Sequence, residues 1–169
     1  LGIQEKYRNP LIVRALMLNC LTKPYSILWE KCYQETFIKD NWSYTDSRLS
    51  PYSRLHRKWD INTPLRSLYE RRQALIEIDV ISAMALGLSL KDLEFIYSIQ
   101  FPILQQNEED TWYDSKGNVV FTCSRGLLGV GVERTTWESI RNQKEGETYI
   151  HTIDPAKSEL YSGQQVTYY

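Results

Sequence analysis

The sequence has few cysteines, few histidines and no long apolar run. Its three cysteines, Cys20, Cys32 and Cys123, include no closely spaced pair, so we expect free thiols in a reducing cytoplasm instead of a disulfide scaffold. The two histidines, His56 and His151, lie far apart, and the spacing of Cys and His predicts no metal site. Because no apolar run approaches the roughly 18 residues of a membrane span, we expect a cytoplasmic protein without membrane contact.

Motifs for nucleotide binding and for nucleophilic catalysis are also missing. Gly126, Gly129 and Gly131 are spaced wrongly for the dinucleotide fingerprint, and neither Lys nor Ser/Thr follows them as a phosphate loop requires. We interpret this cluster as a glycine-rich turn that permits close backbone approach. Nucleophilic catalysis would require a Cys or Ser near a His in space, and no motif indicates such a pair. A stand-alone enzyme is therefore a hypothesis without a supporting motif.

Length and composition set the scale of the fold. A chain of 169 residues with 42% hydrophobic content can bury one sizeable core, which predicts one domain or one domain with an extension. The formal net charge of −1 argues against a wholly basic nucleic-acid coat protein, although local patches are hidden in that sum. The chain begins at Leu1 and ends within a strand-like pattern at residues 166–169, so we expect it to be a fragment of a larger protein.

The middle of the chain predicts a long helix followed by a capped second helix. Residues 65–86 contain no Pro or Gly, and their apolar side chains recur at helical spacing. Gly87 is expected to end this helix, and Ser89 with Asp92 to cap the next one, which closes at Pro102.

The second half of the long helix is apolar on nearly every side. We therefore expect it to be enclosed beyond Leu75, where a buried Asp79 would need a partner.

The flanking regions complete an α+β prediction, with a predominantly helical body and a small β-rich C-terminal part. Apolar spacing predicts helices over residues 10–22 and 25–38, while residues 112–121 read as a hairpin. A short helix from Thr135 or Thr136 to Asn142 and strands over 147–153 and 164–169 follow. The predicted organisation is a helical hairpin (1–39), a basic and aromatic loop region (40–64), a helical core module (65–110) and a small β-rich extension (111–169).

One region carries a family resemblance. Residues 68–109, with an arginine-rich helix start, an acidic residue in an apolar run, then "ALGLSLKDLEFI" and "FPILQQNEE", resemble the C-terminal region of large bacterial adenine-specific DNA methyltransferases of the type IIG restriction-modification and phage-defence kind. The resemblance implies a parent protein that transfers methyl groups from S-adenosylmethionine. That family holds the flipped adenine with an Asn-Pro-Pro-Tyr-type loop, whereas Asn9-Pro10 is followed here by Leu11-Ile12. We therefore assign no catalytic or cofactor-binding residue to this chain, and no cofactor.

A basic stretch is the best candidate for a site. Between residues 48 and 72 seven Lys or Arg stand against two acids, a local net charge of +5, and Tyr52, His56 and Trp59 are interleaved with them. Such a loop suits phosphate-backbone contacts, with aromatic rings packing on sugars or bases. The predicted DNA-binding residues are Arg48, Arg54, Arg57 and Lys58. In the alternative interpretation these charges are solvated or are neutralised by the six acids between residues 92 and 114.

Two functional hypotheses follow. The first is a non-catalytic C-terminal segment of a DNA adenine methyltransferase or restriction-modification protein, which supports target recognition and contacts the DNA backbone. The alternative is a protein–protein interaction module of a multisubunit defence complex, because twelve tyrosines and five tryptophans supply interface anchors. DNA, through the parent protein, and partner proteins are thus the expected partners.

Overall fold

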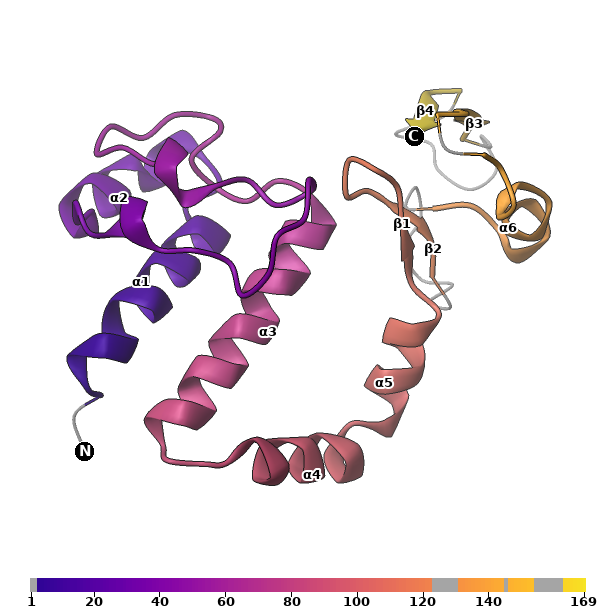
Figure 1. Cartoon of the computed structure of the whole chain (residues 1–169). Helices are drawn as coiled ribbons and strands as arrows, with labels where there is room; N and C mark the ends of the chain where they lie inside the picture. The colour runs from indigo at the N-terminus through magenta and orange to yellow at the C-terminus, as the bar shows by residue number, and fades with distance from the viewer. Residues whose placement is uncertain (1–2, 123–130, 145, 154–162) are drawn as a thin grey trace. The chain divides into compact units, whose positions relative to one another are not determined.

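The computed structural model describes residues 3–122, 131–144, 146–153 and 163–169 (Figure 1). The chain divides into two compact units, Leu1–Tyr97 and Ser98–Tyr169, and each is described by itself. Helices make up the regular structure of the first unit, and the second contains two antiparallel two-stranded sheets. The predicted α+β class, a helical body followed by a small β-rich part, is confirmed.

The first unit is built from helices and short 3₁₀ turns. Its elements are α1 (Glu5–Asn19), η1 (Lys23–Tyr25), α2 (Ser26–Cys32), η2 (Phe37–Lys39), η3 (Tyr52–Arg54), α3 (Leu68–Ala85) and α4 (Leu90–Gln100), which reaches into the second unit. The single helix predicted over 25–38 is wrong, because Tyr33 takes an extended conformation that ends α2. Pro10, predicted at a helix start, lies inside α1.

Local side chains fix both ends of α3. Ser67 and Glu70 form a reciprocal capping box at its N-terminus, a signal that the sequence carries and that our interpretation missed. At the other end Gly87 has φ +80°, as expected for a glycine that ends a helix. Ser89 and Asp92 then bond reciprocally at the start of α4, so the predicted cap is confirmed.

The buried face of α3 differs from the predicted one. Its buried positions include Tyr69, Gln73 and Glu77, whereas Asp79 is exposed. The prediction that the second half is enclosed is wrong, because Met84 and Leu75 remain about half-exposed. The error arises because several residues on the buried face of α3 are polar. A prediction from the spacing of apolar residues places a glutamate on the exposed face.

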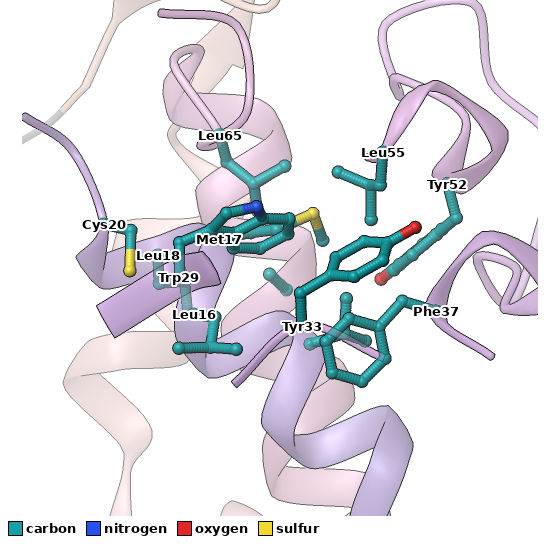
Figure 2. Packing of buried hydrophobic residues seen from close by; sticks show 12 residues of the cluster. Leu16, Met17, Leu18, Cys20, Trp29, Tyr33, Phe37, Tyr52, Leu55 and Leu65 are labelled. Atoms are coloured by element: carbon teal, nitrogen blue, oxygen red, sulfur yellow. The ribbon is translucent and has the colours of Figure 1, made fainter. Parts of the chain in front are cut away.

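A hydrophobic cluster joins α1, α2, α3 and the segment between α2 and α3 (Figure 2). Trp29, Tyr33 and Phe37 contact one another through their rings, with centroids 5.8 to 6.4 Å apart. Met17 and Leu65 pack into the same cluster, and the backbone N–H of Leu65 donates to the carbonyl of Met17. The segment between α2 and α3 is therefore part of the core, although its backbone is irregular apart from the two short turns η2 and η3.

A buried arginine connects three segments of this unit. The Arg14 side chain in α1 is 3% exposed, and its Nε donates to Glu77 Oε2 of α3 at 2.7 Å. Its Nη1 donates to Asp40 Oδ2 at 2.7 Å and to the Pro10 carbonyl, and its Nη2 to the Asn41 carbonyl. This side chain therefore satisfies the polar groups of α1, α3 and the loop after η2 together.

The partner carboxylate is equally well supplied with donors. Glu77 Oε1 accepts from the backbone N–H of Ser43 at 2.8 Å and from Gln73 Nε2 at 2.9 Å. Although burial acts to raise it, these bonds and Arg14 hold the pKa of Glu77 below its ordinary value. The carboxylate thus stays ionised inside the fold and holds residues 40–43 against α3.

The second unit consists of α5 (Pro102–Glu109), β1 (Trp112–Tyr113), β2 (Val119–Phe121), α6 (Arg134–Ile140), β3 (Tyr149–Thr152) and β4 (Gln165–Tyr168). Strand β1 pairs with β2 and β3 with β4, both antiparallel, which confirms the three predicted strand regions. The short helix is also confirmed, although its N-cap is Glu133 instead of a threonine. Among the described residues no helix combines the length and the apolar character that a membrane crossing needs.

Gly131 shows why a glycine stands after β2. It has φ +77°, and a Cβ there would lie 2.8 Å from the carbonyl oxygen of Val120. The neighbouring N–H of Val132 donates to the same oxygen at 2.7 Å, so the two backbones must approach closely. The predicted close backbone approach is confirmed at Gly131, while Gly126 and Gly129 lie outside the described residues.

Replacing Glu77 by glutamine tests the buried ion pair. We expect Glu77→Gln to lower the free energy of unfolding at pH 7 by about 3 kcal/mol, because Arg14 loses a buried anionic partner. The wild-type stability that depends on this lowered pKa is present above the unfolded-state pKa, about 4.3, and is lost as pH falls through the folded-state pKa. Urea unfolding at several pH values measures both effects.

The matched control is Asp79→Asn, an exposed acid on the same helix. It should change the unfolding free energy by less than about 0.5 kcal/mol. Equal effects of the two substitutions would contradict the assigned role of Glu77.

A second prediction concerns Tyr52, whose buried hydroxyl has no hydrogen-bond partner among the described residues. Because an unsatisfied buried hydroxyl is destabilising, Tyr52→Phe should raise the free energy of unfolding by about 1 kcal/mol. Tyr69→Phe should lower it by about as much, since the Tyr69 hydroxyl bonds to Tyr44 and Asp46. Chemical unfolding of both variants decides the matter, and a loss of stability in Tyr52→Phe would refute the first expectation.

Candidate nucleic-acid interface

The four predicted DNA-binding residues fall into two groups, and Arg48 belongs to the group whose side chains are used in contacts within the protein. Its Nε and Nη2 donate to the two carboxylate oxygens of Asp46 at 2.9 and 2.7 Å. Its guanidinium also lies 3.8 Å from the centroid of the Tyr69 ring in α3. The Arg48 guanidinium holds the pKa of Asp46 well below its usual range, so the pair stays ionised and its charges cancel locally.

Arg54 is also used internally. It lies at the end of η3, is half-buried, and donates through Nη1 to the carbonyl of Asn62. This bond closes the loop between the two residues. Arg54 therefore shapes the backbone that carries the other basic side chains.

Arg57 and Lys58, in contrast, are exposed. One Arg57 N–H donates to the carbonyl of Glu30 at 3.3 Å, and the guanidinium lies 5.5 Å from the Tyr33 ring centroid, which orients it without using its other N–H groups. Lys58 has no hydrogen-bond or ion-pair partner in the part of the chain that the structure describes. Both charges remain available to a ligand.

The loop that carries these residues is fixed to the corner between α1 and α2. The indole N–H of Trp29 donates to the His56 carbonyl at 3.0 Å, and that of Trp59 to the Cys20 carbonyl at 2.8 Å. Arg66 Nη2 adds a bond to the Leu21 carbonyl at 2.8 Å. The indole hydrogen bonds of Trp29 and Trp59 therefore hold the loop in place. Its exposed side chains extend from a backbone of fixed conformation.

This attachment brings the exposed Arg57, Lys58 and Arg66 to the corner between α1 and α2, where the exposed Lys23 stands two residues after Leu21. We name this region the basic corner: Lys23, Arg57, Lys58 and Arg66. Three acids lie near it: Glu30 accepts from the backbone N–H of Trp59, Asp60 pairs with His56 at 2.8 Å, and the exposed Glu35 interacts with Tyr33, whose ring Arg57 contacts. Exposed ammonium and guanidinium groups with open donors are the side chains that bind phosphate oxygens.

Sequence analysis found only part of this group. Lys23 was missed because it follows α1 by a few residues and lies far from the basic stretch in sequence. Arg66 was counted in that stretch but was not assigned to DNA. The hydrogen bonds from Arg66 to Leu21 and from Trp59 to Cys20 join the basic stretch to the segment after α1. The periodicity of apolar residues gives no information on such contacts.

The interleaved aromatic residues have another role than the predicted one. Tyr52 is 2% exposed and belongs to the core, and Trp59 packs against the same cluster. Of the three interleaved rings only His56 is exposed. The basic corner therefore offers charges to a phosphate backbone and no tryptophan or tyrosine of that stretch to stack on a base.

The described residues show neither a base-holding loop at Asn9-Pro10 nor a metal-binding group. Asn9 and Pro10 lie inside α1, where the Asn9 amide donates to Thr36 Oγ1 at 3.4 Å, so they form no loop that would hold a base. No group of three or more His, Cys, Asp or Glu side chains in the described ranges is arranged to hold a metal ion.

Comparison with family models, with curated proteins and with solved structures finds no match for the chain.

Proposed function

We propose that this chain is a non-catalytic segment of a bacterial DNA adenine methyltransferase, or of a restriction-modification or phage-defence protein, that supports target recognition and contacts the DNA backbone. The observation that carries the proposal is the basic corner: three exposed cations on a loop anchored by Trp29 and Trp59, together with the exposed Lys23 of η1. The resemblance of residues 68–109 supports the choice of parent protein. Methyl transfer and S-adenosylmethionine belong to another part of that parent.

The chemistry of the corner sets the kind of contact. Lys58 and Lys23 are mobile point charges, whereas Arg57 and Arg66 are oriented by bonds to backbone carbonyls. Such groups neutralise phosphates without reading bases, so binding is sequence-independent and weakens steeply with salt. Sequence recognition is then left to other parts of the parent, and this segment contributes affinity and register.

The proposed compartment is the bacterial cytoplasm. Cys20 is buried and Cys32 half-buried, and both are free thiols, as the sequence predicted for a reducing compartment. Burial raises the pKa of the Cys20 thiol, which keeps it protonated and unreactive at neutral pH.

A second candidate function, a protein–protein interaction module in a defence complex, is favoured by exposed apolar side chains. Neither α4 nor α5 has a buried residue among those described. Leu90 of α4 is 68% exposed and Ile103 of α5 is 74% exposed. Side chains of this kind stabilise protein contacts that survive high salt, whereas phosphate contacts weaken with salt, so salt dependence separates the two functions.

The double variant Arg57→Gln/Lys58→Gln tests the proposal. We expect it to weaken binding to any duplex sequence and to flatten the dependence of log affinity on log salt by about two, because two phosphate contacts are lost. Fluorescence anisotropy with a labelled random duplex, between low and moderate salt, measures both quantities.

The matched control is Lys6→Gln/Arg8→Gln, which removes the same charge from exposed positions at the start of α1. This variant should retain most of the affinity and the salt slope. If the two double variants bind duplex equally well, the basic corner is not the contact, and salt-resistant capture of a protein would favour the second candidate function.

A further inference from the structure

The second unit holds an aromatic group that the proposed function does not use. Trp137 of α6 lies with its ring centroid 5.8 Å from that of Phe121 in a parallel stack. The centroid of Trp112 lies 5.3 Å from that of Trp137, with the two rings tilted by 35°. Phe121 is buried, but Trp112 is 51% exposed. A large aromatic ring thus remains half in solvent while it is supported by a second indole.

Strand pairing explains how Trp112 reaches this position. Trp112 is the cross-strand partner of Phe121, and the register shifts between Trp112 and Tyr113. Cross-strand partners place their side chains on one face of the sheet. A register shift such as the one between Trp112 and Tyr113 changes the direction of the neighbouring side chain. Trp112 and Phe121 consequently both contact Trp137.

Helix α6 adds positive charge beside these rings. Arg134, Trp137 and Arg141 follow one another at spacings of three and four residues, which places them along one helix face. The Arg134 guanidinium lies 5.5 Å from the Phe121 ring centroid, and both arginines are exposed. Glu138, next to Trp137 in sequence, is the acid of this helix and partly offsets their charge.

We propose that Trp112 and Trp137 form a stacking platform for an unpaired nucleobase of a single-stranded nucleic acid, with Arg134 and Arg141 contacting its phosphates. Exposed aromatic faces flanked by arginines are the recurrent elements of single-strand binding, because every base has a π-face to stack. A paired base is enclosed within the duplex stack, so this platform favours single strands. The site is separate from the basic corner, and it does not depend on the duplex contacts proposed there.

The test uses the full chain and a labelled oligothymidylate of about twelve nucleotides. Trp112→Ala should raise the Kd for this probe about tenfold, within the range expected for loss of one stacked base. Trp112→Phe, which keeps an aromatic ring, should recover most of the affinity. Ile150→Ala removes an exposed side chain of the same unit, 57% exposed on β3, and should leave the Kd unchanged.

A second probe separates stacking from charge. An abasic strand of the same length keeps the phosphates and lacks the bases, so the wild-type protein should bind it about as weakly as Trp112→Ala binds oligothymidylate. Trp112→Ala should cause no further loss with the abasic strand.

The proposal is overturned if Trp112→Ala binds oligothymidylate with the wild-type Kd, or if that variant weakens the binding of both strands equally. Circular dichroism of Trp112→Ala checks that the unit stays folded, and if it does not, the Trp112→Phe variant and the abasic strand decide. Arg57→Gln/Lys58→Gln should leave the effect of Trp112→Ala on the single strand in place. Failure of the basic corner and failure of the platform are therefore distinguishable.

Discussion

The ion pair between Arg14 and Glu77 is the interaction on which the first unit depends. A buried guanidinium and a buried carboxylate each lose several kcal/mol of hydration, so the pair is tolerated only where their remaining hydrogen bonds are satisfied. Here Asp40 and the carbonyls of Pro10 and Asn41 complete the bonds of Arg14, while Ser43 and Gln73 complete those of Glu77. Two apolar residues of similar volume would stabilise a helix pair as well, but they would not fix the position of residues 40–43.

The loop after residue 40 follows from that constraint. Ser50 donates its backbone N–H to Glu70 at 3.0 Å, so α3 holds both ends of the segment between residues 43 and 50 through two buried glutamates. The next part of the loop is then held by Trp29 and Trp59 against the corner between α1 and α2. These contacts hold the backbone of the irregular segment in one conformation. They thereby fix the backbone positions from which the exposed basic side chains extend. The functional proposal rests on this chain of contacts.

Local sequence signals predicted some ends of elements, although the Ser67–Glu70 capping box and the end of α2 were missed. Gly87 and the pair of Ser89 and Asp92 were identified because a positive φ and a reciprocal cap have short-range signatures. The hairpin around Gly117 was found for the same reason. Each of these features is decided by residues a few positions apart, and no tertiary contact is needed to form it.

Long-range polar contacts were the part that the sequence could not supply. Asp79 was expected inside, where the structure instead has Glu77 with Arg14 as its partner. Glu77 is buried because its partner Arg14 lies 63 residues away in sequence, and the spacing of apolar residues does not indicate such a partner. The candidate site was predicted in part: Arg57 and Lys58 are exposed, and Lys23 joins them only through long-range contacts of the fold. Arg48, in contrast, is held by Asp46 two residues away, a local pair that our interpretation missed.

Each of the two units exposes side chains that suit one kind of nucleic-acid contact. The first unit buries its loop aromatics as anchors and exposes cations, which suits a phosphate backbone. The second unit exposes Trp112 in an aromatic group whose Phe121 carries Arg134 over its ring, which suits an unpaired base. A segment that supports target recognition in a base-modifying protein has use for both, because a base that is modified must leave the duplex.

Lysine acetylation mapped by mass spectrometry, with and without duplex DNA, tests the central claim most directly. If the basic corner contacts the DNA backbone, duplex at low salt should protect Lys23 and Lys58 and leave the exposed Lys6 and Lys39 as reactive as before. The protection should disappear at moderate salt. Equal reactivity of Lys58 and Lys6 in the presence of bound duplex would contradict the account.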